Sequence, residues 1–284
     1  MSTEQGPTVR ELAVQALSST EHGYDLLAPK FDRTPYRTPD RVLDAVTAEV
    51  RRLGPFGTGL DVCCGTGAGV GVLRQVCRER VVGVDFSAGM LAEAREAFPP
   101  GDGGRGASAE GQAVEAPPVE APPVEGQAAA DLAVEGRGVA VPAVEAPAVD
   151  WVRADARSLP FGPAFDLALS FGAFGHFLPA ERPGLFAEVH ASLRPGGLFA
   201  FPIGAPPPVG SRAYWSLLGF DAAMRVRNAL WRPRFVMYYR TFRLGDVLED
   251  LTRAGFAVRL MPLTGLGRRP DGSPRARLVV ATRE

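Results

Sequence analysis

Residues 61–69 read DVCCGTGAG and combine two features that bind ligands in proteins. Paired cysteines are typical of metal or redox chemistry, and alternate glycines are typical of a backbone that comes close to a ligand. Adjacent residues on a strand point to opposite faces, so Cys63 and Cys64 cannot easily bind one metal ion together. Cys77, in the next predicted helix, completes no ligand set. We expect the cysteines to be small apolar residues packed beneath the loop, and no metal site.

The glycines lie where a predicted strand turns into a helix, but they do not form the dinucleotide fingerprint. That fingerprint requires glycine at the first, third and sixth places of the loop. Counted from Gly65 the sixth place is Val70, and counted from Gly67 it is Val72. A nicotinamide-dependent dehydrogenase is therefore the weaker interpretation of this loop.

Three aspartates stand at the ends of predicted strands. Asp61 comes just before the glycine loop, and Asp155 ends the strand 149–155. Asp85 ends the second strand, 20 residues after Gly65, the spacing at which a carboxylate accepts hydrogen bonds from a ribose diol. A single aspartate at such a place more often caps a helix or lies in solvent. Three at consecutive strand ends favour a cofactor site, because ligands of doubly wound sheets bind there.

The elements that must position these residues alternate along the chain. Short apolar runs that end in glycine or aspartate predict strands, and apolar residues at helical spacing predict helices. Ser87 is the expected N-cap of one helix. The alternation predicts a doubly wound, mostly parallel sheet with helices on both faces. The predicted strands are 58–64, 81–86, 149–155, 165–171, 198–204, 256–263 and 276–283, and the predicted helices are 38–53, 68–80, 87–98, 180–193 and 244–256.

Residues 101–149 interrupt this alternation. They repeat VEAPPVEAPPVEG, hold no aromatic residue, and carry eight acidic and two basic residues, a net charge of −6. Proline every few residues opposes both helix and strand. We expect a disordered insert that acts as a spacer, with binding of a specific partner as the less favoured alternative. Without the insert about 235 residues remain (284 minus 49), a normal size for one α/β domain.

The chain resembles class I S-adenosylmethionine-dependent methyltransferases. The motifs that carry this resemblance are, in order, GLDVCCGTGAG, VVGVDFSAGML, ADARSLPF, FDLALSFGAFGHF and LRPGGLFAF. They span Tyr24 to Phe201 apart from the insert, and the first two are most similar to the branch that methylates quinone rings. One departure is Cys63, at a place where the family often has glycine. The resemblance implies a Rossmann-like sheet of seven strands and S-adenosylmethionine as the cofactor.

The resemblance also implies roles for residues of this chain. Asp61 would hold the amino group at the methionine end, with Gly65, Thr66 and Gly67 along that end. Asp85 would bind the ribose hydroxyls. Carboxylates suit the cation, the amine and the diol of this cofactor. The remaining implied contacts are Phe86 beside the adenine, Asp155 and Ala156 at the adenine amino group, Phe171 and Gly172 facing the sulfonium and the acceptor, and Tyr24 closing over the cofactor.

Methyl transfer requires alignment more than a catalytic group, and a base helps only where the acceptor loses a proton. His176, after the fourth strand in SFGAFGHF, is the candidate base; local packing of a loop histidine is the alternative. His190 lies mid-helix and is interpreted as structural.

Specificity is expected outside the motifs. Residues 1–40 form a predicted N-terminal cap, in which Tyr24 and Phe31 either cover the cofactor or simply pack. Residues 41–284 form one domain, and within it residues 205–240 form a predicted cap with six arginines, one aspartate and many aromatic residues. That helical, aromatic cap either lines an acceptor pocket, packs with solvated arginines, or touches an anionic membrane surface.

Composition narrows the class of protein. The net charge of −1 gives no overall attraction to nucleic acid, and the three cysteines do not make a disulfide framework. No signal peptide or apolar run of membrane-spanning length is present, so we expect a cytoplasmic protein. The leading hypothesis is a methyltransferase for a small acceptor such as a quinone, phenol or polyketide. The alternative is a non-catalytic cofactor-binding or scaffold protein on the same fold. Oligomeric state is left open.

Overall fold

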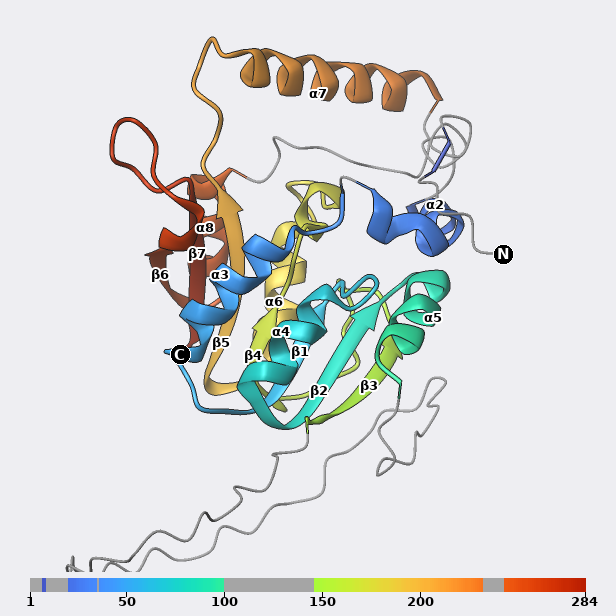
Figure 1. The fold of residues 1–284 in the computed structure, drawn as a ribbon, viewed down its shortest axis with the longest axis vertical. Helices are drawn as coiled ribbons and strands as arrows, with labels where there is room; N and C mark the ends of the chain where they lie inside the picture. Colours follow the sequence, from blue (N-terminus) through green and yellow to red (C-terminus); the bar gives the residue numbers. More distant parts are fainter. Residues whose placement is uncertain (1–6, 9–19, 35, 100–145, 232–242) are drawn as a thin grey trace, which may run out of the picture.

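A seven-stranded sheet forms the centre of the molecule, with strand order β3-β2-β1-β4-β5-β7-β6. The computed structural model describes residues 7–8, 20–34, 36–99, 146–231 and 243–284. Strands β1 to β5 pair in parallel, and β7 runs antiparallel to both β5 and β6 (Figure 1). The strands are β1 (Phe56–Val62), β2 (Cys77–Asp85), β3 (Ala148–Arg153), β4 (Phe165–Leu169), β5 (Leu193–Gly204), β6 (Phe256–Pro262) and β7 (Ala276–Arg283). The predicted α/β class and mostly parallel, doubly wound sheet are confirmed.

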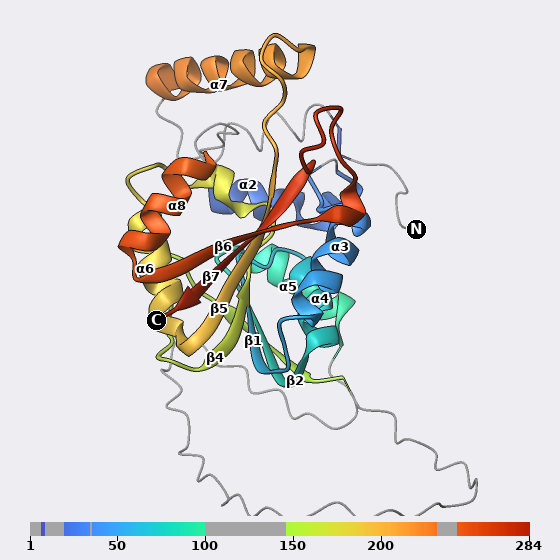
Figure 2. The ribbon, with the colours of Figure 1, turned by 90° about the vertical axis from the view of Figure 1, so that its left-hand side faces the viewer.

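Helices cover both faces of the sheet. One face packs against α3, α4 and α5, and the other against α6 and α8 (Figures 1 and 2). Ser87 accepts a hydrogen bond from the Met90 N–H, as the predicted N-cap of α5 should. The α-helices are α2 (Thr20–Leu27), α3 (Asp40–Arg51), α4 (Ala68–Val76), α5 (Ala88–Ala97), α6 (Arg182–Ser192), α7 (Arg212–Trp231) and α8 (Leu244–Arg253); the 3-10 helices are η1 (Ala28–Arg33), η2 (Ala173–His176) and η3 (Thr264–Leu266).

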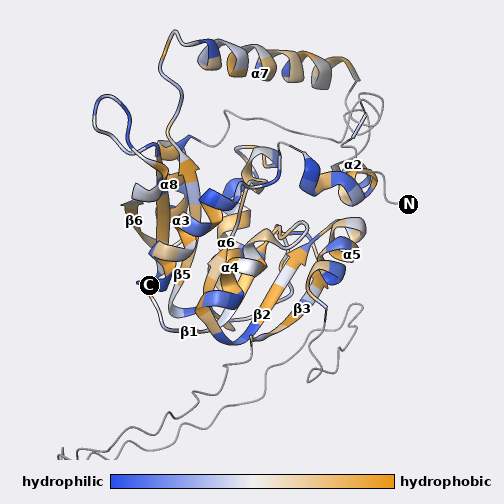
Figure 3. Cartoon of the chain, viewed as in Figure 1, coloured by the Kyte–Doolittle hydropathy of each residue, from blue (hydrophilic) through white to orange (hydrophobic). Residues whose placement is uncertain are grey.

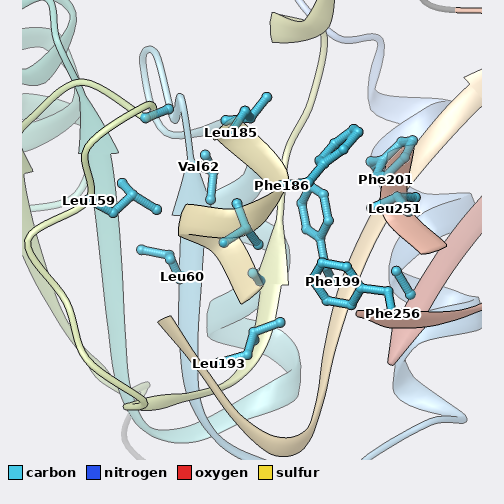
Figure 4. Packing of buried hydrophobic residues seen from close by; sticks show 14 of the residues in the cluster. Leu60, Val62, Leu159, Leu185, Phe186, Leu193, Phe199, Phe201, Leu251 and Phe256 are labelled. Atoms are coloured by element: carbon cyan, nitrogen blue, oxygen red, sulfur yellow. The ribbon is translucent and has the colours of Figure 1, made fainter. Parts of the chain in front are cut away.

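The core follows the period of two that a sheet buried on both faces requires. On β7, Val279 and Ala281 face the α6 and α8 side, whereas Leu278 and Val280 face the α3 and α4 side. Figure 3 shows the strands as the most apolar part of the fold, with polar residues on the outer sides of the helices. Four phenylalanines, Phe186, Phe199, Phe201 and Phe256, pack together where α6 and α8 meet β5 and β6 (Figure 4).

Two predicted boundaries are wrong by four residues or more. The predicted helix 68–80 ends at Val76, and Cys77 begins β2 because it pairs with Phe56 of β1. Strand β5 begins at Leu193, five residues before the predicted start at 198, and its register against β4 shifts between Phe165 and Leu167. The helical cap predicted over residues 205–240 contains, in its described part, the 20-residue helix α7.

The two predicted caps and the insert are described only in part. Within the N-terminal cap, residues 20–33 form α2 and η1 and Asp40 begins α3, and residues 205–231 of the second cap include α7. Residues 100–145 and 232–242 lie outside the described residues. The predicted insert ends too late by two residues, because Ala148 and Val149 belong to β3. Among the described helices, none combines the length and the apolarity needed to cross a bilayer.

Candidate functional site

A cavity of about 1140 Å³ opens at the carboxyl ends of β1, β2, β3 and β4. Parallel strands bring the residues that follow them to one edge of the sheet, which is why distant motifs meet there. One predicted residue, Gly67, is absent from the lining. The predicted residues that do line the cavity are Tyr24, Asp61, Gly65, Thr66, Asp85, Phe86, Asp155, Ala156, Phe171, Gly172 and His176.

The loop between β1 and α4 is left-handed at three residues. Cys63, Gly65 and Gly67 have φ of 59°, 53° and 94°. Nothing lies within 4 Å of a Cβ built on Gly65, so this glycine leaves open space toward the cavity. A Cβ on Gly67 would meet Phe98 at 2.7 Å, so Gly67 is required by packing and by its φ rather than by the cavity.

Cys63 does not lie on a strand, which corrects the prediction of two adjacent strand cysteines. Strand β1 ends at Val62, and Cys63 takes a conformation that favours glycine. Burial raises the pKa of the Cys63 and Cys64 thiols well above the ordinary value, and that of Cys77 to about 12. All three are therefore protonated at neutral pH, and thiolate chemistry is disfavoured.

Asp61 is a buried carboxylate at the bottom of the cavity, 1% exposed. Neither of its oxygens makes a hydrogen bond of ordinary geometry with the described residues. Burial raises the pKa of Asp61 well above its usual value, the N–H groups of Val70 and Gly69 lower it by less, and the charge of Asp85 raises it again. A buried acceptor without a partner carries a desolvation cost that a bound ammonium group would offset.

Asp85, 6% exposed, accepts hydrogen bonds from both the glycine loop and the start of α5. One carboxylate oxygen accepts from the Gly65 N–H and the other from the Ser87 N–H, each at 2.9 Å. Burial raises the pKa of Asp85, and these N–H groups oppose the shift. Each oxygen keeps a second lone pair, so the carboxylate can still accept from a diol.

Asp155 has a partner that the sequence interpretation did not include. The Arg157 guanidinium binds both of its oxygens, and this hydrogen bond is the largest cause that lowers the pKa of Asp155. Arg157 also pairs with Glu181. Arg157 therefore holds Asp155 in place at the rim of the cavity. The sequence DAR, which places an arginine two residues after the aspartate, could have indicated this pair.

The basic residues of the cavity lie at its rim, whereas Asp61 and Asp85 lie at its bottom. At the rim, Arg153 pairs with Glu21 at 2.6 Å, and Arg157 pairs with Asp155 and Glu181. No described basic side chain forms an ion pair with Asp61 or Asp85. The bottom of the cavity is thus acidic, which suits a cationic ligand and opposes the pyrophosphate of a dinucleotide.

The N-terminal segment is bonded to the cavity loops through residues that sequence reasoning missed. Asp25 on α2 accepts from the Ser87 hydroxyl at 2.6 Å and from the Gly89 N–H at 2.9 Å. Asp32 on η1 accepts from the Thr66 hydroxyl at 2.7 Å. The only sequence signal was a set of acidic residues in a segment otherwise noted for aromatics.

His176 and Tyr24 meet across the cavity. The Tyr24 hydroxyl lies 2.5 Å from His176 Nε2, and the two rings stack edge to face at 5.2 Å. His176 ends η2, which begins after Gly172, a left-handed residue with φ of 72°. Tyr24 also contacts Phe31 and Phe86 ring to ring. His190 lies elsewhere and packs against Phe256.

These residues fit S-adenosylmethionine. The orphaned carboxylate of Asp61 suits its amino group, Asp85 its ribose diol, and the open space at Gly65 its passage between them. The aromatic rings of Phe86 and Tyr24 suit the adenine.

Comparison with known proteins agrees with this chemistry. Two family models, each described as a methyltransferase domain, match residues 60–122 and 126–201. The DhpI–SAH complex shares the fold with a TM-score of 0.53 at 15% identity, over 96% of this chain and 98% of DhpI. A possible histamine N-methyltransferase from Thermotoga maritima has a TM-score of 0.51 at 14% identity, over 93% of this chain and 99% of that one. No protein of curated function is similar enough in sequence to match.

Proposed function

We propose that this chain, a class I S-adenosylmethionine-dependent methyltransferase by its fold and its two domain matches, methylates a small-molecule acceptor bound in the cavity. The observation that carries the proposal is the unpartnered carboxylate of Asp61 at the bottom of that cavity. The bound cofactor supplies an electrophilic methyl group on a sulfonium. The protein then has to hold that cation, exclude water and direct the acceptor.

Each of these tasks has a candidate residue. Asp61 holds the ammonium group of the cofactor and Asp85 its ribose diol, because both are buried and neither has a basic partner among the described residues. Phe171 and Gly172, after β4, form the wall on the acceptor side. The α2–η1 segment excludes water, since Asp25 and Asp32 fasten it to the loops after β1 and β2.

His176 is the proposed base for acceptors that lose a proton. Its Nε2 lies at hydrogen-bond distance from the Tyr24 hydroxyl, so this nitrogen is directed into the cavity. An acceptor hydroxyl that takes the place of the Tyr24 hydroxyl would donate to the same nitrogen and pass it a proton.

Replacing His176 tests whether this residue acts as a base without contributing to cofactor binding. His176→Asn should lower kcat by about 100-fold or more, the range for loss of general base catalysis, while the dissociation constant of S-adenosylmethionine changes by less than about twofold. Tyr24→Phe, which keeps the ring and removes only the hydroxyl, is the matched control and should retain most of kcat. An unchanged kcat in His176→Asn would remove this residue from the mechanism.

The acceptor class and the existence of turnover need a direct assay. We infer an aromatic acceptor, such as a quinone, phenol or polyketide, from the resemblance of the first two motifs and from the aromatic residues of the cavity. Transfer of a labelled methyl group to a metabolite extract would test this, with Asp61→Ala as the blank. Binding of S-adenosylmethionine without any labelled product would favour the non-catalytic alternative.

A further inference from the structure

Two aspartates of the N-terminal segment, Asp25 and Asp32, are bonded to the cavity loops but do not themselves line the described cavity. Each directly follows an aromatic residue that does line it, so the sequence contains the pairs Tyr24-Asp25 and Phe31-Asp32, seven residues apart. In each pair the aromatic ring faces the cavity and the carboxylate contacts a loop beside it. The aspartates therefore affect the cavity through the residues that they hold.

Asp25 holds α2 against the beginning of α5. Its Oδ1 accepts hydrogen bonds from the Ser87 hydroxyl at 2.6 Å and from the Gly89 N–H at 2.9 Å. A carboxylate is stabilised at this place, because the N-terminus of a helix carries partial positive charge. Ser87 is fully buried, and its N–H donates to Asp85. Asp25 thus joins α2 to the loop that carries the proposed ribose ligand.

The backbones of α2 and α5 approach closely at Gly89. A Cβ on Gly89 would lie 3.0 Å from Asp25 Cα and 3.1 Å from the Asp25 carbonyl oxygen. The optimal separation between carbon atoms is about 3.5–4.0 Å, so a side chain at this position would displace α2. The hydrogen bonds of Asp25 therefore belong to a packed contact and not to a loose surface one.

Asp32 makes a second attachment, to the glycine loop. Its Oδ1 accepts from the hydroxyl of Thr66, which is 8% exposed and lines the cavity. Asp32 is itself exposed, and the same oxygen lies 4.0 Å from Arg37 Nε. Solvent and a second cation compete for this carboxylate, so its hydrogen bond to Thr66 should contribute less than those of Asp25.

The aromatic members of the two pairs extend across the cavity. The Tyr24 and Phe31 rings lie 6.1 Å apart, and Tyr24 also contacts Phe86 at 6.5 Å and His176 at 5.2 Å. In both ribbon views α2 lies beyond the carboxyl end of β2 (Figures 1 and 2). The α2–η1 segment therefore reaches from the loop after β2 to the turn after β4.

We propose that Asp25 and Asp32 are positioning residues, which keep Tyr24 and Phe31 over the bound cofactor and thereby set the rate of its release. The proposal rests on cofactor binding in this cavity, as the proposed function does, and is independent of the acceptor. A ligand beneath the rings leaves only when the segment moves, and the segment moves only when these hydrogen bonds break. Loss of a carboxylate should therefore accelerate dissociation, while association should not become slower.

The dissociation rate of S-adenosylhomocysteine, the demethylated cofactor, tests the proposal without any acceptor. Asp25→Ala should raise this rate by about tenfold or more, the effect of losing a hydrogen bond to a charged group, and Asp32→Ala by about threefold. A variant that is merely less stable would contain less active protein but release ligand at the parent rate. Asp44→Ala is the matched control, since Asp44 is exposed on α3 and outside the cavity, and it should behave like the parent.

Gly89→Ala is the second test, because it displaces α2 without changing any charge. The comparison is needed since the charge of Asp25 also acts on Asp85. Overpacking at Gly89 should raise the dissociation rate by about fivefold or more. Gly184→Ala on α6, where a Cβ would meet nothing within 4 Å, is its matched control and should release ligand at the parent rate.

The outcomes separate this proposal from the proposed function. A parent-like dissociation rate in either Asp25→Ala or Gly89→Ala, with S-adenosylhomocysteine bound by the parent, would overturn the positioning role alone. Failure of the parent to bind S-adenosylhomocysteine would overturn the positioning role together with the proposed function.

Discussion

At the scale of single residues, Asp61 is a buried carboxyl at the bottom of the cavity, where we propose that it binds the ammonium group of the cofactor. Its pKa is raised, foremost by burial. A carboxyl whose folded pKa is raised contributes stability that is complete below its ordinary pKa and is lost as pH rises through the folded value. In the protein without cofactor, ionisation of Asp61 therefore costs stability as pH rises through its raised pKa.

Asp61→Asn should reduce the loss of stability that accompanies a rise in pH. Without cofactor, the Tm of the variant should fall less between pH 5 and pH 8 than that of the parent, as thermal unfolding at several pH values would measure. Affinity for S-adenosylmethionine should drop by about 10-fold or more, because a hydrogen bond to a charged group contributes about 1.5–3 kcal/mol. Equal pH slopes in variant and parent would contradict the burial of an ionising Asp61.

Two glycines of α4, Gly69 and Gly71, allow a second test of the proposed contact between Asp61 and the cofactor. A Cβ on Gly69 would lie 2.5 Å from an oxygen of Asp61, whereas a Cβ on Gly71 would meet nothing closer than Phe98 at 3.6 Å. Gly69→Ala should therefore displace the carboxylate and weaken S-adenosylmethionine binding by about tenfold or more, the effect of losing one charged hydrogen bond. Gly71→Ala should keep the affinity and stabilise the protein by about 0.5–1 kcal/mol through helix propensity. Calorimetric titration and urea unfolding measure the two effects, and equal affinities would contradict the close approach.

Sequence reasoning named residues that line one cavity, with the exception of Gly67, but it missed several of their hydrogen-bond partners. The glycine loop and the strand-end aspartates were accessible because parallel strands leave one edge for all of them. The Asp25–Ser87 and Asp32–Thr66 hydrogen bonds were not, since each joins residues far apart in the chain and no local pattern specifies them.

At the scale of helices and strands, α6 and α8 are joined by a buried ion pair. Arg182 Nε lies 2.9 Å from Asp250 Oδ2, with side chains 6% and 9% exposed, as an ion pair without the alignment of a hydrogen bond. Removing one partner of such a pair leaves a buried charge without that counter-ion, which costs far more than the pair itself contributes.

Asp250→Ala should accordingly lower the free energy of unfolding by about 3–5 kcal/mol. Glu249→Ala is the neighbouring control, because Glu249 pairs with Arg253 at the surface and is 71% exposed. Loss of that exposed pair should cost less than about 1 kcal/mol. Urea unfolding of both variants measures the difference, and similar values would show that the Arg182–Asp250 pair is not desolvated.

Most elements were predictable from sequence, and the wrong boundaries have a common cause. The CRER stretch after α4 reads as the polar side of a helix, yet Cys77 and the following residues extend β2 because β1 offers an unpaired edge. Pairing partners of this kind come from elsewhere in the chain, so periodicity alone does not place them. Helix α7 lies in the predicted helical cap, but hydrophobic periodicity does not give its bounds, because apolar residues occupy both of its sides.

At the scale of the whole molecule, the two domain matches end and begin inside the predicted insert, at residues 122 and 126. Among the described residues, α5 (Ala88–Ala97) is followed by β3 (Ala148–Arg153), and the expectation that the insert is a spacer stays a prediction.

Replacing residues 101–145 by a short glycine–serine linker should leave S-adenosylmethionine affinity within about twofold and stability within about 1 kcal/mol, because long surface insertions affect a core little. A deletion to residue 149 is the matched control. It also removes Ala148 and Val149, which pair with Arg80 and Val81 of β2, so it should be less stable. Thermal unfolding compares the two, and loss of folding in the shorter deletion would show that the segment is structural.

The place of β7 in the sheet also bears on the order of assembly during translation. Strand β6 is synthesised before β7, yet β7 lies between it and β5 and is its partner in the sheet. Strand β6 therefore has no partner in the sheet until Ala276–Arg283 has been synthesised. Strands β1 to β5, which carry the cavity, already have one another as partners by then. Cofactor present during synthesis would thus meet a nearly complete site before the sheet itself is complete.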